Sequence, residues 1–122
     1  MLKDSLYTLQ SLEETGAGTY EAQLRIDPTH PLFEGHFPGQ PVLPGVCLLE
    51  MVKEVLSEIR QKPLRLLRAG TIKYPSMVDP RLEPLLRFEI TIAEAEEELK
   101  VGVNSFLSDG SANFKLIKAS FV

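Results

Sequence analysis

Residues 35–50 read Gly35-His36-Phe37-Pro38-Gly39-Gln40-Pro41-Val42-Leu43-Pro44-Gly45-Val46-Cys47-Leu48-Leu49-Glu50. The first part of this stretch is rich in proline and glycine, and the second part is an apolar run that carries one carboxylate. Because proline fixes φ and glycine permits backbone geometry that is closed to other residues, the stretch predicts a rigid connector rather than a flexible loop. A base at one end and a carboxyl group at the other suggest proton-transfer chemistry.

A long helix is predicted to follow the connector, from about residue 46 to residue 60. The segment contains no proline or glycine and is closed by Pro63. At 100° per residue, one broad apolar face forms from Leu48, Met51, Val52, Val55, Leu56 and Ile59. The opposite, polar face is predicted to hold Lys53, Glu54, Ser57 and Arg60. The same count places Glu50 within the polar arc.

About six strands are predicted around this helix. Residues 5–26 alternate as two strands joined by a turn at residues 16–18, and further strands are predicted over residues 64–76, 83–94, 98–107 and 113–122. The short connections favour antiparallel pairing. The sequence therefore predicts a single α+β domain over residues 1–122, with a sheet wrapped around one helix.

Composition argues against several classes of function. The net charge of −4 provides no basic stripe for nucleic acid. No apolar run approaches the length of a membrane span, and the N-terminus has no signal-peptide core, so a cytoplasmic protein is expected. The single cysteine, Cys47, lies between apolar residues and is expected to be a small buried thiol. With two histidines and one cysteine, neither a metal site nor a cofactor is expected.

The connector and the helix start together provide the groups that a dehydration needs. Histidine exchanges a proton at neutral pH without extreme tuning, which makes His36 a candidate base. Glu50, if buried among its apolar neighbours, would be favoured in its neutral, proton-donating form. Gly45 stands just before or at the helix start, where free N–H groups and the helix dipole would polarise a carbonyl oxygen. Removal of water from a 3-hydroxyacyl thioester requires such a base, acid and oxyanion site.

The residues alone leave a plain structural alternative open. A single histidine in a loop is more often a hydrogen-bonded structural residue, and a glutamate on a polar helix face is ordinarily solvated. His30, which precedes Pro31 in a turn, is expected to have a surface or packing role.

The connector resembles the signature of a known enzyme family, the 3-hydroxyacyl-(acyl carrier protein) dehydratases of bacterial fatty acid synthesis. The matching positions are His36-Phe37-Pro38-Gly39, then residues 41–46, then Glu50. The branch that it resembles has a catalytic His and Glu, whereas the dehydratase/isomerase branch carries an Asp at the helix position. The resemblance is strong over residues 31–51, looser over 71–92, and limited to pattern elsewhere.

The resemblance implies a fold, an assembly and roles for residues. It implies the hotdog fold and a homodimer, possibly a higher oligomer, in which His36 of one subunit faces Glu50 of the other. His36 would be the base, Glu50 the acid or water-orienting group, and the Gly45 N–H the oxyanion donor. The substrate would be carried on the phosphopantetheine arm of acyl carrier protein, and its acyl chain would lie in an apolar tunnel. The tunnel residues implied are Phe37, Val42, Leu49 and Tyr74.

The sequence also departs from the family. The residue four positions after the catalytic Glu is usually Gln, and here it is Glu54; the family's Pro-Gly-Asp turn is altered at residues 78–81. A fatty acid enzyme and a specialised acyl or polyene enzyme are both compatible with these changes. Two other functions stay open: a hotdog thioesterase, and a non-catalytic subunit that binds acyl groups or a partner. Carrier docking would involve basic residues, for which Arg60, Lys62, Arg65 and Arg68 are candidates.

Overall fold

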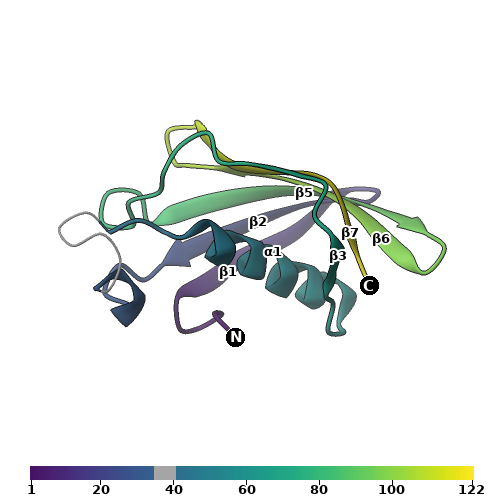
Figure 1. The fold of residues 1–122 in the computed structure, drawn as a ribbon, viewed down its shortest axis with the longest axis horizontal. Helices are drawn as coiled ribbons and strands as arrows, with labels where there is room; N and C mark the ends of the chain where they lie inside the picture. The colour runs from purple at the N-terminus through teal and green to yellow at the C-terminus, as the bar shows by residue number, and fades with distance from the viewer. Residues whose placement is uncertain (35–40) are drawn as a thin grey trace.

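A single antiparallel sheet curls around helix α1 (Gly45–Arg60) in the part of the chain that the computed structural model describes, residues 1–34 and 41–122 (Figure 1). A 3-10 turn, η1 (Pro31–Phe33), precedes the helix. The strands are β1 (Tyr7–Gly16), β2 (Thr19–Ile26), β3 (Leu66–Arg68), β4 (Thr71–Lys73), β5 (Leu85–Ala95), β6 (Glu98–Phe106) and β7 (Ala112–Phe121). The predicted α+β architecture, with a sheet wrapped around one helix, is confirmed.

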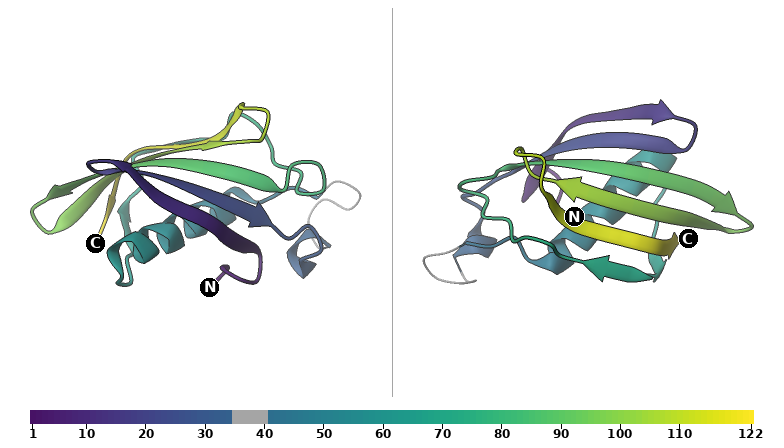
Figure 2. Two further views of the ribbon diagram at one scale, coloured as in Figure 1. Left: turned by 180° about the vertical axis from the view of Figure 1, so that it is seen from behind. Right: turned by 90° about the horizontal axis from the view of Figure 1, so that it is seen from above.

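The strands follow the order β1-β2-β5-β6-β7-β3, and β4 also pairs with β7. All pairings are antiparallel. The longest ladder joins β5 to β6, from Arg87–Phe106 to Ala95–Glu98, and the two strands are connected by an exposed turn at Glu96 and Glu97. Figure 2 shows β3 at the edge of the sheet beside β7, with β1 at the opposite edge. Within the described residues, the β3–β4 edge pairs with β7 alone.

The core lies between α1 and the concave face of the sheet. Alternate residues of β5 and β6 point toward the helix, as the period of two requires. The helix contributes its apolar stripe, with Met51, Val52 and Val55 all 0% exposed. Against it pack the large side chains Phe88, Phe114 and Phe121. Each such burial stabilises the fold by about 1.5–3 kcal/mol, so the helix is held by packing rather than by its intrinsic propensity.

Both ends of α1 follow from the local sequence. Gly45 is the first helical residue, and Pro44 at the cap position provides no side-chain hydrogen bond. At the other end Gln61 adopts the left-handed conformation with φ 55°, and the Lys62 N–H donates to the Ser57 carbonyl. Pro63 then prevents continuation. None of the helices in the described ranges is both long and apolar enough to cross a bilayer.

The edge strand differs from its prediction. Residues 64–76 were expected to form one strand, but the structure divides them into β3 and β4. The division occurs at Gly70, whose φ is +66° and whose position faces the carbonyl groups of Ile117 and Lys118. Lys118 itself has φ 58°, which kinks β7 at the same level. The positive φ angles of Gly70 and Lys118 therefore coincide with the break in a strand that side-chain alternation alone predicted to be continuous.

Replacing Gly70 with alanine is expected to destabilise the protein by at least about 2 kcal/mol. The new Cβ would clash with the carbonyl oxygens of Ile117 and Lys118, and these backbone atoms cannot move aside without disturbing β7. Gly110 is a matched control, because its φ is +89° but nothing lies within 4 Å of the added Cβ. Gly110→Ala is expected to cost only about 1 kcal/mol. Urea unfolding of the two variants checks the difference, and equal costs would contradict the packing argument.

Candidate active site

The start of α1 packs against a tyrosine ring. A Cβ built on Gly45 would lie 2.5 Å from the Tyr74 ring and hydroxyl oxygen, so only glycine leaves room for the ring at this distance. Tyr74 also packs against Phe114, with ring centroids 5.4 Å apart, and remains 49% exposed. Burial of one part of the ring raises the pKa of the Tyr74 hydroxyl. As the first residue of the helix, Gly45 has an N–H with no intrahelical carbonyl to bind.

Replacing Gly45 with alanine is expected to displace the Tyr74 ring and to lower stability by about 1–3 kcal/mol. The same substitution in a Tyr74→Ala background removes the clash. There alanine is expected to be neutral or stabilising by up to about 1 kcal/mol, because its helix propensity exceeds that of glycine. Thermal unfolding of the four proteins in this cycle measures the coupling. If the stability changes of the two single variants added up in the double variant, contact with Tyr74 would not be the reason that position 45 requires glycine.

Glu50 lies one turn further along α1, on a flank that is partly open to solvent. Its side chain is 35% exposed, and its Oε1 forms an ion pair with Lys53 Nζ at 3.0 Å. Val46, on the same flank, is 74% exposed. The burial of Glu50 among apolar neighbours that the sequence suggested is therefore only partial within one chain. The helical count that placed Glu50 in the polar arc is confirmed.

The structure corrects the prediction for Glu54. The helical count put it on the solvated face, yet it is only 4% exposed. Residues 2–7 contribute to this burial, because they donate three hydrogen bonds to the carboxylate. The sequence contained one sign that Glu54 is unusual, because the dehydratase family that this chain resembles usually has Gln at this position.

The other predicted site residues divide into two groups. Val42 and Leu49 are partly buried, and the adjoining Leu43 N–H donates to the Val78 carbonyl at 2.9 Å. The connector is thereby joined to the segment that follows Tyr74. His36 and Phe37 fall outside the described residues, so their predicted roles stay predictions.

His30 and Cys47 have structural surroundings, as expected. His30 Nδ1 accepts the Leu32 N–H at 3.0 Å, and Nε2 lies 3.1 Å from Ser5 Oγ, so this ring caps η1. Cys47 is buried, and burial together with the Glu50 charge raises the pKa of its thiol. A protonated, buried thiol is a poor nucleophile. In the described ranges, no group of three His, Cys, Asp or Glu side chains is arranged to hold a metal ion.

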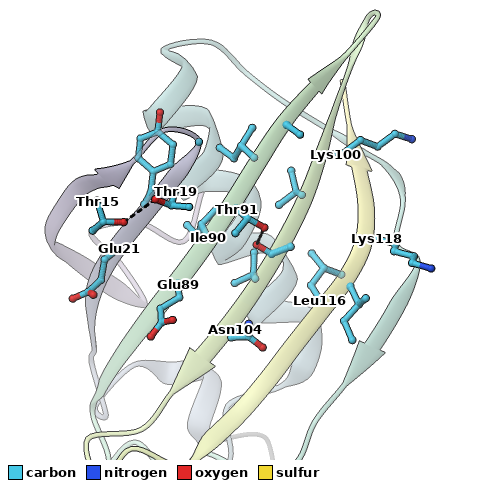
Figure 3. A pocket seen from close by; sticks show the side chains of 18 of the residues that line it. Thr15, Thr19, Glu21, Glu89, Ile90, Thr91, Lys100, Asn104, Leu116 and Lys118 are labelled. Atoms are coloured by element: carbon cyan, nitrogen blue, oxygen red, sulfur yellow. Dashed lines mark hydrogen bonds between the residues drawn. The ribbon is translucent and has the colours of Figure 1, made fainter.

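A hollow of about 820 Å³ lies on the face of the sheet opposite the helix. Figure 3 shows its lining, with Glu21 and Glu89 on one side and Lys100 and Lys118 on the other. Its floor includes Gly102, which has no side chain. Of the sequence-predicted site residues that the structure describes, which are Val42, Gly45, Leu49, Glu50 and Tyr74, none lines it.

Comparison with known proteins places the chain. The family model described as "ApeI-like: ApeI dehydratase" matches residues 12–111. The chain belongs to the ApeI-like dehydratase family. This ApeI-like chain is also 31% identical, over 72% of its length, to the 3-hydroxyacyl-(acyl-carrier-protein) dehydratase FabZ of Haemophilus influenzae. A FabZ of Syntrophobacter fumaroxidans is 29% identical over 49% of the chain. The alignments span 61% and 46% of those two relatives.

Solved structures confirm the hotdog fold of this ApeI-like protein. The dehydratase heterocomplex ApeI:P from Xenorhabdus doucetiae contains a chain that superposes with a TM-score of 0.73. That match has 22% identity and covers 93% of this chain and 94% of the other. A thioesterase from Haemophilus influenzae superposes with a TM-score of 0.55 and 13% identity, covering 92% and 77%. The fold is therefore shared by dehydratases and thioesterases, and the chemistry must be argued from the site.

Proposed function

We propose that this protein is a homodimeric dehydratase that converts a 3-hydroxyacyl thioester on acyl carrier protein into the trans-2-enoyl thioester. Membership of the ApeI-like dehydratase family over residues 12–111 carries the proposal. The His36 and Glu50 positions of the sequence signature support it, because a dehydratase needs both a base and an acid.

The proposed chemistry assigns one step to each group. The thioester carbonyl oxygen binds at the Gly45 N–H, where the helix N-terminus favours developing negative charge. His36 removes a proton from the carbon next to the carbonyl. The carbon–oxygen bond at the third carbon then breaks, Glu50 protonates the departing hydroxyl, and water leaves. The proton held by His36 returns to Glu50 before the next turnover, so no cofactor is needed.

A second copy of the chain would complete this site. Glu50 is partly exposed, and Val46, one turn earlier on the same helix, is 74% exposed. Met77, in the segment that pairs with the connector through the Val78 carbonyl, is 69% exposed. In the described part of the chain, the outer edge of β3 and β4 has no strand partner. Leu66 and Leu67 on that edge are 38% and 46% exposed. A row of free backbone groups flanked by apolar side chains suits pairing with another strand edge. The partner would bring its own His36 to this Glu50.

The basic residues proposed for carrier docking lie near this edge. Arg60 and Arg68 form ion pairs with Glu94 and Glu98, both at 2.9 Å. Lys62 and Arg65 are exposed. An acidic carrier protein would interact most directly with the latter two residues, since exposed charges steer association.

One assay distinguishes the candidate functions. The purified protein is given a 3-hydroxyacyl thioester of acyl carrier protein, and enoyl product and free thiol are measured in parallel. Enoyl formation without thiol release is expected. Thiol release would instead indicate the thioesterase function, for which the thioesterase neighbours provide the fold. Absence of both products from every acyl chain length tried would favour a non-catalytic binding subunit.

A further inference from the structure

The side chain of Tyr74 is held in a fixed position beside the start of α1. Its ring packs against Phe114, with the ring centroids 5.4 Å apart, and Phe114 itself is 0% exposed. Strand β4, which ends one residue before Tyr74, pairs with β7. Two residues after Tyr74, the Ser76 hydroxyl donates to the Ala112 carbonyl at 2.9 Å. The backbone on both sides of Tyr74 is therefore attached to β7, so its ring is placed before any ligand binds.

The hydroxyl of Tyr74 lies at the N-terminal end of the helix. A Cβ built on Gly45 would be 2.5 Å from this oxygen. In a helix the Cα–Cβ bond tilts toward the N-terminus, which is also the direction in which the first N–H groups point. Because a Cβ lies about 2.5 Å from the nitrogen of its own residue, the hydroxyl oxygen is at most about 5 Å from the Gly45 nitrogen.

The donors at this helix end have no hydrogen-bond partner in the described part of the chain. The first N–H of α1 that donates to a carbonyl is that of Cys47, which bonds Pro44. The Gly45 and Val46 N–H groups before it are therefore free within the described ranges. The Tyr74 hydroxyl is free there too, so it does not cap the helix. These donors remain available for an acceptor from outside the chain.

A single oxygen can accept from both the hydroxyl and the Gly45 N–H. An N–H···O bond is about 2.9 Å long and an O–H···O bond about 2.7 Å, so two such donors can share one acceptor when they are up to about 5.6 Å apart. The separation of at most about 5 Å satisfies this condition. We propose that Tyr74 is a catalytic residue whose hydroxyl, together with the Gly45 N–H, donates to the thioester carbonyl oxygen. This inference rests on the proposed dehydratase function.

The hydroxyl is suited to stabilise the charge that forms on this oxygen. When His36 removes the proton from the neighbouring carbon, negative charge develops on the carbonyl oxygen, and a donor that is already in place stabilises it without reorganising. Burial raises the pKa of Tyr74 above that of a free tyrosine, so the hydroxyl keeps its proton over the range in which a histidine acts as a base. The predicted tunnel role concerns the ring of Tyr74, and the oxyanion role concerns its hydroxyl, so the two are compatible.

Tyr74→Phe tests the proposal, because it keeps the ring against Gly45 and Phe114 and removes only the hydroxyl. The kcat for enoyl formation is expected to fall by about tenfold or more with little change in KM, since the hydroxyl acts mainly on charge that develops in the transition state. The unfolding temperature should not change, because in the described part of the chain the hydroxyl has no hydrogen bond to lose. An unchanged kcat, or a rise in KM alone, would overturn the proposal.

Tyr20→Phe is the matched control. Tyr20 lies on β2, which β5 and β6 separate from β7, and within the described residues its hydroxyl also has no hydrogen-bond partner. Its kcat is expected to equal that of the parent protein. A fall equal to that in Tyr74→Phe would show that the loss does not depend on the helix start, and the proposal would be wrong.

A second measurement separates this inference from the dehydratase function. A 3-hydroxyacyl pantetheine thioester with carbon-13 at its carbonyl is bound to Glu50→Gln, in which turnover is slow, and to Glu50→Gln/Tyr74→Phe. Infrared difference spectra give the stretching frequency of the labelled carbonyl, which falls when its oxygen accepts hydrogen bonds. A higher frequency in the double variant supports the oxyanion role even if the parent protein forms no enoyl product, which would refute only the dehydratase function. Equal frequencies, or no binding of the thioester to Glu50→Gln, would refute the role of Tyr74.

Discussion

Replacing His36 with alanine, or Glu50 with glutamine, is expected to lower kcat/KM for dehydration by about 100-fold or more. The reason is that a positioned general acid or base contributes about 10²–10⁴-fold to a proton-transfer step. Glutamine keeps the shape of Glu50 but has no proton to give. Rates of enoyl formation from a carrier-bound 3-hydroxyacyl substrate measure both effects.

Two control variants separate loss of chemistry from loss of fold. His30→Ala removes the other histidine, whose ring caps η1 and bonds Ser5, so it should reduce stability slightly and leave the rate unchanged. Glu58→Gln changes a carboxylate two turns after Glu50 on the same helix and should also remain active. Full dehydratase activity in both His36→Ala and Glu50→Gln would show that the proposed mechanism is wrong.

The fold was predictable because its signals are local. Two strands follow from a period of two in the sequence, over residues 19–26 and 85–95. The helix follows from a run without proline or glycine, over residues 46–60. None of these patterns depends on distant residues. The interruption at Gly70 was not predictable in this way. It depends on the carbonyl groups of Ile117 and Lys118, which are far away in sequence and are brought opposite Gly70 only by the sheet register.

The candidate site was predictable only in part, for the same physical reason. Glu50 and Gly45 could be chosen from their spacing along one helix. The burial of Glu54 depends on a segment some fifty positions earlier in the chain, so a helical wheel counted it as solvated. Likewise, the contact of Tyr74 with Gly45 becomes visible only once the chain has folded.

Mixing two inactive variants is expected to restore activity if the site is shared between subunits. In a dimer formed from His36→Ala and Glu50→Gln, the intact His36 of one subunit meets the intact Glu50 of the other. One of its two sites is then complete, and the other lacks both groups. Random pairing makes about half of the dimers mixed, so roughly a quarter of the parent activity should return. Refolding the variants together and measuring enoyl formation gives the result.

The outcome distinguishes a site shared between two subunits from a site formed within one chain. If His36 served the Glu50 of its own chain, every site in the mixture would lack one group, and the rate would stay at the average of the two variants. The position of Glu50 favours the shared arrangement, because its side chain is 35% exposed on a flank where Val46 is also open. A mixture of His36→Ala with the His36→Ala/Glu50→Gln double variant is the control. Exchange of subunits occurs there too, but no intact His36 is present, so no activity should return.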